Sequence, residues 1–175
     1  SIPPTWYDYN QEKQYDVSCM FGYPTKEPVY EHGVCQTDYY DPHRKQLLDT
    51  LGNKYNISGL KNGERVSTQE YYNKMYNSKI IMSPLGYGGM APRDIEAVAF
   101  GSVLIKPDIS YLDSKPFIYE DNETYIACKY DWSDVEKKID HVLSNYNELR
   151  EYLVQNMRKR YDEEYKYLKI ALHIY

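Results

Sequence analysis

The chain has 175 residues, a formal net charge of −5 and 22 tyrosines. Its length suits one domain with a core of its own, while the acidic balance argues against the broad basic surface of a general nucleic-acid binder. No apolar run approaches the roughly 20 residues that cross a bilayer, and no signal peptide opens the chain, so we expect no membrane span and a cytoplasmic protein.

Apolar stretches bounded by capping and turn residues predict strands that alternate with helices. Asp41 before Pro42 is typical of a helix start, and Ser67, three residues before Glu70, forms a capping box that opens another helix. A short apolar run without helical spacing indicates a buried strand. The expected elements are strand 15–21, helix 41–51, strand 54–60, a helix from Ser67 through Tyr76, strand 79–82, a helix from Pro92 through Ala99 and strand 102–105.

The last third of the chain is expected to be mostly helical. Ser133, three residues before Glu136, repeats the capping box, and apolar residues then recur at helical spacing. The expected elements here are a loop at 108–121, strand 124–129, a helix that begins after Ser133, a closing helix of about 149–165 and a short last helix within 168–175.

This alternation predicts crossover connections, and therefore a parallel sheet with helices on both faces. We expect an α/β fold over residues 15–175, with a doubly wound, Rossmann-like sheet of about five to six strands. Residues 1–14 are expected to be a linker or the remnant of a preceding domain. In such sheets ligands bind at the carboxyl ends of the strands, near the point where the strand order reverses.

The most informative segment is 83–97, with the sequence SPLGYGGMAPRDIEA, between an expected strand and an expected helix. Its glycines let the backbone approach a ligand closely, and the amides at the start of the next helix are suited to bind a phosphate. Arg93 adds a planar, permanently charged donor group. Glu96 follows on the same face of the helix, where its carboxylate could accept hydrogen bonds from both hydroxyls of a ribose.

The same segment has a purely structural interpretation. A glycine-rich turn after a strand is often only a turn, and Arg93 with Glu96 could be a surface pair. The segment is not a Walker motif, because no Gly-Lys-Ser or Gly-Lys-Thr follows the glycines, and no Gly-x-Gly-x-x-Gly follows the first strand. The residues alone therefore leave a phosphate site and a structural turn both open.

Residues 79–106 resemble the donor-site segment of glycosyltransferases with the GT-B fold, in both the group-1 and the exostosin-like families. In these families a strand end with serine or proline leads through a glycine loop to Arg-x-x-Glu-Ala, a small residue, glycine and a hydrophobic strand. Here the corresponding sequences are KIIMSPLGYG and RDIEAVAFGSVLIK. The resemblance implies the C-terminal domain of such an enzyme, which binds a nucleoside-diphosphate sugar. The sugar would pass to a carbohydrate or glycoconjugate acceptor held by an N-terminal domain outside this chain.

The resemblance also implies roles for individual residues. The glycine segment would cradle the diphosphate, Glu96 would hold the ribose, and Arg93 would neutralise the phosphates and stabilise the leaving group. Arg44 and Lys45 begin a helix where the family often places basic phosphate contacts, although a solvated helix start is the plain alternative. The residues expected to bind the nucleotide sugar are Gly22, Tyr23, Arg44, Lys45, Ser83, Gly86, Tyr87, Gly88, Gly89, Met90, Ala91, Arg93 and Glu96.

Two departures from the family's pattern limit what the resemblance implies. Retaining members of the group-1 family often carry a second glutamate eight residues before the one that binds the ribose, and this position is Gly88 here. The general base of inverting members usually lies on the acceptor domain, so the catalytic base is expected outside this chain.

The expected site needs no metal and no other cofactor. The chain lacks Asp-x-Asp, the motif that holds a divalent metal in the other main glycosyltransferase fold. Stabilisation of the leaving diphosphate would then come from helix amides and arginine. The alternative is a non-catalytic nucleotide-binding or interaction module on the same fold, because a fold alone does not assign a function. A methyltransferase is less consistent, because its glycine loop would follow the first strand.

Overall fold

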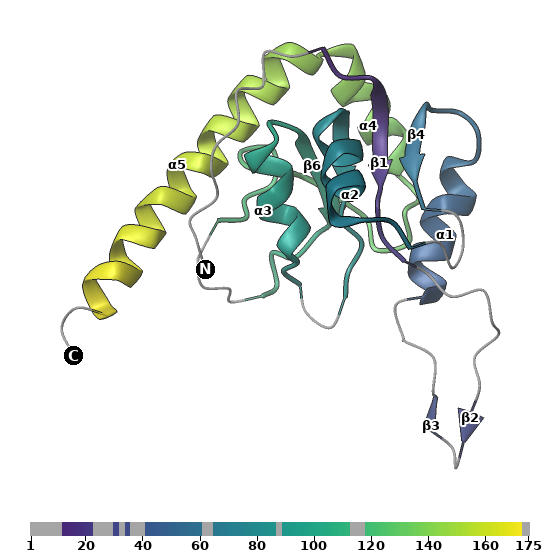
Figure 1. The fold of residues 1–175 in the computed structure, drawn as a ribbon, viewed down its shortest axis with the longest axis horizontal. Helices are drawn as coiled ribbons and strands as arrows, with labels where there is room; N and C mark the ends of the chain where they lie inside the picture. Colours follow the sequence, from purple (N-terminus) through teal and green to yellow (C-terminus); the bar gives the residue numbers. More distant parts are fainter. Residues whose placement is uncertain are drawn as a thin grey trace.

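A five-stranded parallel sheet forms the centre of the molecule (Figure 1). The computed structural model describes residues 12–22, 30–31, 34–35, 41–60, 65–86, 89–112 and 118–172. The strands are β1 (Tyr15–Cys19), β4 (Ile57–Gly59), β5 (Ser78–Met82), β6 (Val103–Pro107) and β7 (Ile126–Cys128). Their order is β4-β1-β5-β6-β7, so the chain runs outward from β1 to one edge and then returns past β1 to the other. The expected doubly wound α/β sheet is confirmed.

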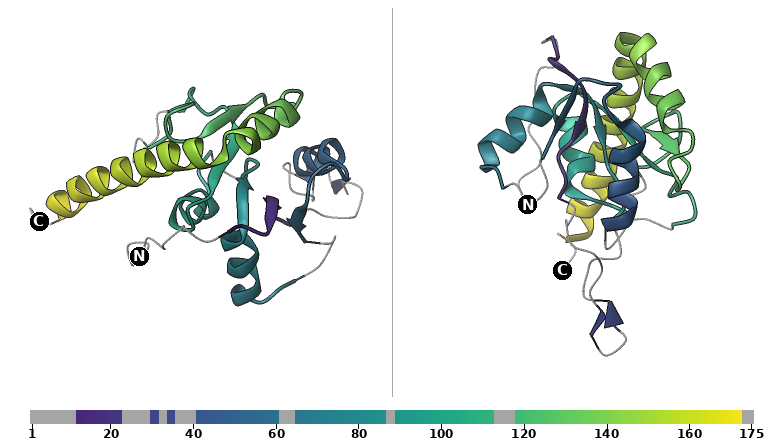
Figure 2. Two further views of the ribbon diagram at one scale, coloured as in Figure 1. Left: turned by 90° about the horizontal axis from the view of Figure 1, so that it is seen from above. Right: turned by 90° about the vertical axis from the view of Figure 1, so that its right-hand side faces the viewer.

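Helices cover both faces of this sheet (Figure 2). They are α1 (Asp41–Leu51), α2 (Thr68–Tyr76), α3 (Pro92–Ala99), α4 (Val135–Ser144) and α5 (Tyr146–Leu172). Because successive strand residues point to opposite faces, Ile80 and Met82 pack with α1 and α4, whereas Ile81 packs with α2 and α3. The helix α5 contributes to both cores. Burial on both faces explains why β5 and β6 contain runs of three adjacent apolar residues without alternation.

The start of α4 differs from the expected capping box. The N-cap position is held by Asp134, with no hydrogen bond from its side chain to the helix. Two aspartates organise the preceding turn instead: Asp131 accepts from the Ser133 amide at 3.0 Å, and Asp134 accepts from the Lys129 amide at 2.9 Å. The prediction that Ser133 caps this helix is therefore wrong.

Other boundaries also differ. The closing helix is one continuous α5 to Leu172, so the separate short helix expected within 168–175 is not formed in the described residues. No proline or glycine interrupts this stretch. The strand β6 extends to Pro107, beyond the expected end at Ile105. A short antiparallel pair, β2 (Tyr30–Glu31) and β3 (Val34–Cys35), was not expected. The expected linker at 1–14 lies mostly outside the described residues.

Arg158 of α5 closes the end of α3. Its guanidinium donates to the carbonyl oxygen of Val98 at 2.8 and 3.1 Å and to that of Ala99 at 3.0 Å. A cation is favourable at this end of a helix. We expect Arg158→Met to lower the free energy of unfolding, measured in urea, by about 1–2 kcal/mol. The control is Arg160→Met, which removes two ion pairs with partly exposed glutamates, Glu120 and Glu123, and should cost less than about 1 kcal/mol. Equal losses would contradict the capping role.

Candidate functional site

The strand order reverses between β1 and β5, and several of the sequence-predicted residues meet there. Gly22 follows β1, Gly86 follows β5, and Arg44 lies in the first turn of α1. The Nη1 atom of Arg44 donates to the carbonyl oxygen of Gly22 at 2.8 Å. A Cβ atom at Gly86 would lie 3.7 Å from Nη2 of the same arginine. These three residues are therefore neighbours at the edge of the sheet where ligands bind in doubly wound folds.

Arg93 reaches the same place from the first turn of α3. Its guanidinium carbon lies 5.6 Å from the centre of the Phe21 ring, at the end of β1. Its Nε and Nη1 atoms are buried and have no hydrogen-bond partner among the described residues. Within the described part of the chain, Arg93 and Glu96 do not form an ion pair with each other. The interpretation of these two residues as a surface pair is therefore not supported.

Glu96 lies in a pocket of about 540 Å³ beside Arg93. The Tyr71 hydroxyl donates to Oε2 of Glu96 at 2.8 Å. Burial raises the pKa of Tyr71, and the charge of Glu96 raises it further, so the phenol stays protonated and donates. The pocket lies between the segment after β4 and the first turns of α2 and α3. Its walls include Leu60, Arg65, Tyr71, Tyr72, Arg93 and Glu96.

A buried ion pair that the sequence did not predict lies at the start of α3. Lys106 Nζ is 2.6 Å from Asp94 Oδ2, and the two side chains are 1% and 0% exposed. The hydroxyls of Ser83 (2.5 Å) and Tyr119 (2.7 Å) also donate to Asp94. The ammonium group of Lys106 donates further to the carbonyl oxygen of Gly89 at 2.5 Å. The pair thus connects α3, β6 and the glycine segment.

Asp94, Lys106, Ser83 and Tyr119 form a polar cluster, and burial determines the direction of its pKa shifts. Burial lowers the pKa of Lys106, and the carboxylate of Asp94 acts in the opposite direction by stabilising the ammonium form. Burial also raises the pKa of Tyr119, and the charge of Asp94 adds to the shift. The phenol of Tyr119 therefore remains a donor. One signal for the cluster was present in the sequence, because Lys106 is the single charged residue in an otherwise apolar strand and lysine is rarely buried unless paired.

Some predicted site residues are occupied by these internal contacts. The hydroxyl of Ser83 is used by Asp94, and so is the amide of Ala91, which donates to Oδ2 at 3.1 Å. Pro92 has no amide hydrogen. Among residues 91–93 at the start of α3, where amides were expected to bind a phosphate, the described contacts thus leave only the amide of Arg93.

The remaining predicted residues have different surroundings. Lys45 is exposed and forms an ion pair at 2.5 Å with Asp49, one turn along α1, and no described contact joins it to the other site residues. Met90 is 39% exposed. A Cβ atom at Gly89 would lie 2.1 Å from Leu112 Cδ1, so any larger residue would displace Leu112. The residues Tyr23, Tyr87 and Gly88 lie outside the described residues.

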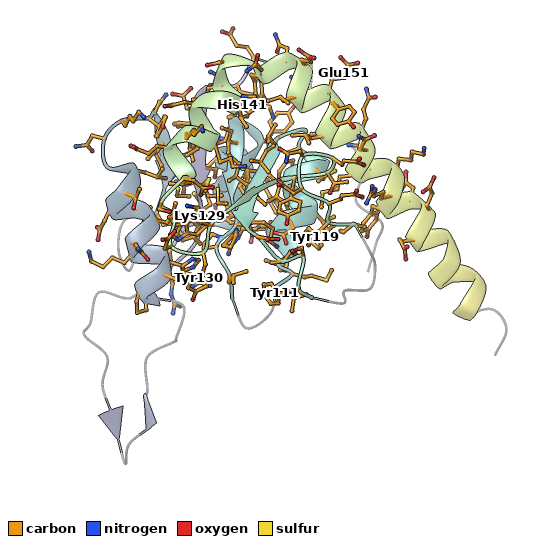
Figure 3. The ribbon with its side chains drawn as sticks, turned by 180° about the vertical axis from the view of Figure 1, so that it is seen from behind. Tyr111, Tyr119, Lys129, Tyr130, His141 and Glu151 are labelled. Carbon is orange, nitrogen blue, oxygen red and sulfur yellow. The ribbon has the colours of Figure 1, made fainter. Side chains whose placement is uncertain are left out.

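The start of α1 is held by aromatic residues that follow β7, far along the chain. The His43 ring stacks between those of Tyr130 and Trp132, with ring centres 4.5 and 4.7 Å apart. The indole of Trp132 donates to the carbonyl oxygen of His43 at 3.1 Å. These contacts position the adjacent Arg44. In Figure 3, Tyr130 lies with Tyr111 at the edge where the strands end.

Two further properties concern the described residues as a group. Within these ranges no three histidine, cysteine, aspartate or glutamate side chains lie close enough together to hold a metal ion. No helix found there combines the length and the apolar surface that a membrane span needs.

Comparisons with known proteins gave a family and a distant structural neighbour. The model of a family described as glycosyl transferase-like matches residues 40–174. No curated protein matches the sequence. A solved structure with a similar arrangement is the C-terminal domain of a glycosyl transferase group 1 family protein (LpcC) from Francisella tularensis. It is 19% identical, with a TM-score of 0.49, and the match covers 71% of this chain and 61% of that chain.

Proposed function

The chain belongs to the glycosyl transferase-like family, and from this premise we propose that it is the donor-binding domain of a GT-B glycosyltransferase. It would bind a nucleoside-diphosphate sugar in the crevice between β1 and β5. An N-terminal domain outside this chain would supply the acceptor site and the catalytic base. The reaction would transfer the sugar to a carbohydrate or glycoconjugate and release the nucleoside diphosphate.

The observation that carries the proposal is the state of Arg93. Two of its nitrogens are buried without a hydrogen-bond partner among the described residues. Buried polar groups without partners are costly, and a cation at the start of a helix opposes the helix dipole. A bound diphosphate would remove both costs. It would also place the guanidinium beside the group that gains negative charge as the sugar leaves.

The pocket beside Arg93 supports the position of the nucleoside. Since Tyr71 already donates to Oε2 of Glu96, the carboxylate would offer Oε1 to a ribose hydroxyl. This differs from the expectation that Glu96 accepts from both hydroxyls. The aromatic rings of Tyr71 and Tyr72 line the same pocket and provide apolar surface for a base.

The proposal is tested by calorimetric titration of the 175-residue chain with UDP, GDP and ADP, without added metal. We expect saturable binding of at least one of them, and little sugar transfer to an added acceptor. No binding of any would contradict the proposal and would favour an interaction module. Binding only in the presence of a divalent metal would contradict the metal-independent part.

Glu96→Gln should separate the nucleoside contact from the phosphate contact. We expect the affinity for the bound nucleoside diphosphate to fall about tenfold, because the neutral amide has one acceptor oxygen, for which Tyr71 and the ribose compete, and no charge to strengthen the bond. The affinity for inorganic pyrophosphate should be unchanged, because it has no ribose. Calorimetry measures both. Glu151→Gln is the control, since this exposed residue of α5 lies on the opposite side of the molecule from Tyr111 and Tyr130 (Figure 3). Equal losses for the two ligands would remove the ribose role.

A further inference from the structure

The buried ion pair ties the glycine segment to the fold at three points. Asp94 accepts from the hydroxyl of Ser83, at the start of the segment, and from the amide of Ala91, at its end. Lys106 donates to the carbonyl oxygen of Gly89 between them. One aspartate and one lysine therefore hold Ser83, Gly89 and Ala91 of the segment that is proposed to receive the diphosphate.

The ammonium group of Lys106 cannot contact a bound ligand from this position. Its side chain is 1% exposed, and its ammonium group is enclosed by Gly89, by Asp94 and by the ring of Tyr119, whose centre is 4.5 Å away. The pair also adds no net charge to the crevice, because Asp94 neutralises Lys106. Any effect of Lys106 on a bound phosphate must therefore pass through the backbone that it holds.

The contact with Gly89 has a definite consequence for the next amide. In a trans peptide the carbonyl and the following N–H point in opposite directions across one rigid plane. Lys106 holds the Gly89 carbonyl toward the interior, so the N–H of Met90 points away from the buried lysine. Met90 lies at the surface, with 39% of the residue exposed, so a ligand outside the buried ion pair could reach this peptide.

We propose that Lys106 is a positioning residue that gives the site its selectivity for phosphate, by orienting the Gly89–Met90 peptide so that its N–H faces the diphosphate. This inference rests on the proposed function. A buried ion pair can often be replaced by apolar residues of similar volume without loss of stability. Apolar residues could fill the same space but could not hold the Gly89 carbonyl.

The test uses the double variant Asp94→Asn with Lys106→Met, which leaves no unpaired buried charge. Its thermal unfolding midpoint is measured first and is expected to stay close to that of the wild type. The binding of a nucleoside diphosphate and of inorganic pyrophosphate should weaken about tenfold, as expected for a lost hydrogen bond to a charged group. The binding of the corresponding free nucleoside, measured by ligand-detected NMR, should be unchanged.

The control is Lys79→Met, which removes a lysine from a partly exposed ion pair with Asp16. This pair lies at the amino ends of β1 and β5, whereas the proposed site lies at their carboxyl ends. This variant should bind all three ligands as the wild type does. Equal weakening for nucleoside and diphosphate in the double variant would mean a merely structural role and would overturn the proposal. An unchanged pyrophosphate affinity would overturn it too. Failure of the wild type to bind any nucleotide would instead refute the proposed function, and this inference with it.

A second measurement does not depend on affinity. Hydrogen exchange at the Met90 amide, followed by NMR, should slow in the wild type when pyrophosphate is added, because the amide then donates to the ligand. In the double variant the same addition should give no such protection at matched saturation. Protection of Met90 in both proteins would show that Lys106 does not orient this peptide.

Discussion

Replacing Arg93 with alanine is expected to weaken the binding of the nucleoside diphosphate about thirty- to hundredfold, or roughly 2–3 kcal/mol. The physical reason is the loss of charge-assisted hydrogen bonds from a guanidinium group to phosphate oxygens. The stability of the free protein should change by less than about 1 kcal/mol, because Arg93 loses a contact with the Phe21 ring and one with the Tyr71 hydroxyl, and that hydroxyl keeps Glu96 as its partner. Calorimetry and urea unfolding measure the two effects separately.

The controls for Arg93 use other cations. Arg93→Lys should restore little of the affinity, because a single ammonium group cannot replace the planar donor pair. Arg160→Ala should leave the affinity unchanged, since Arg160 pairs with Glu120 and Glu123 on the surface. An affinity for Arg93→Ala within twofold of the wild type would exclude Arg93 from the phosphate site.

Replacing Asp94 with alanine should give the largest loss of stability, about 3–5 kcal/mol at pH 7. The substitution leaves the ammonium group of Lys106 buried without its counter-ion. It also removes the acceptor for the hydroxyls of Ser83 and Tyr119. Urea unfolding of the variant and the wild type measures the difference.

The loss in Asp94→Ala should shrink as the pH rises. Burial already lowers the pKa of Lys106, and the variant lacks the carboxylate of Asp94 that opposes this shift. Above this lowered pKa and below the value of about 10.4 for an unfolded lysine, the unfolded chain binds more protons than the folded one. The free energy of unfolding of the variant therefore rises with pH in this window. A deficit that stays constant between pH 7 and pH 9.5 would contradict an uncompensated Lys106.

The double variant Asp94→Ala with Lys106→Met provides the control for this pH dependence. It should recover a large part of the lost stability at pH 7, because no buried charge remains. The difference in the free energy of unfolding between this double variant and the wild type should not shrink as the pH rises, in contrast to the difference for Asp94→Ala. A double variant that is as unstable as Asp94→Ala would show that the cavity, and not the charge, causes the loss.

Local signals in the sequence predicted the elements around the crevice. Ser67 caps α2, with its hydroxyl 3.1 Å from the Glu70 amide. Pro92 begins α3, and Gly101, with a φ of +66°, follows its end. Each of these features depends on residues within one helical turn. The glycine segment between β5 and α3 could be placed for the same reason.

The polar cluster could not be predicted in this way. Lys106 lies 12 residues from Asp94, and Tyr119 lies 25 residues from it, so their meeting depends on how β6 and the loop before β7 pack. The carboxylate of Asp94 could equally have remained a solvated first-turn residue. Only the packed fold shows that Asp94 takes the Ala91 amide, which the sequence had assigned to phosphate.

The aromatic stack around His43 has a consequence for how the site is assembled. The hydrogen bond from Trp132 to His43 joins residues 89 positions apart, and such non-local contacts are made slowly because a long loop must close first. A chain that ends before Tyr130 lacks both aromatic partners of His43. The first turn of α1, with Arg44, is thus synthesised well before the residues that support it.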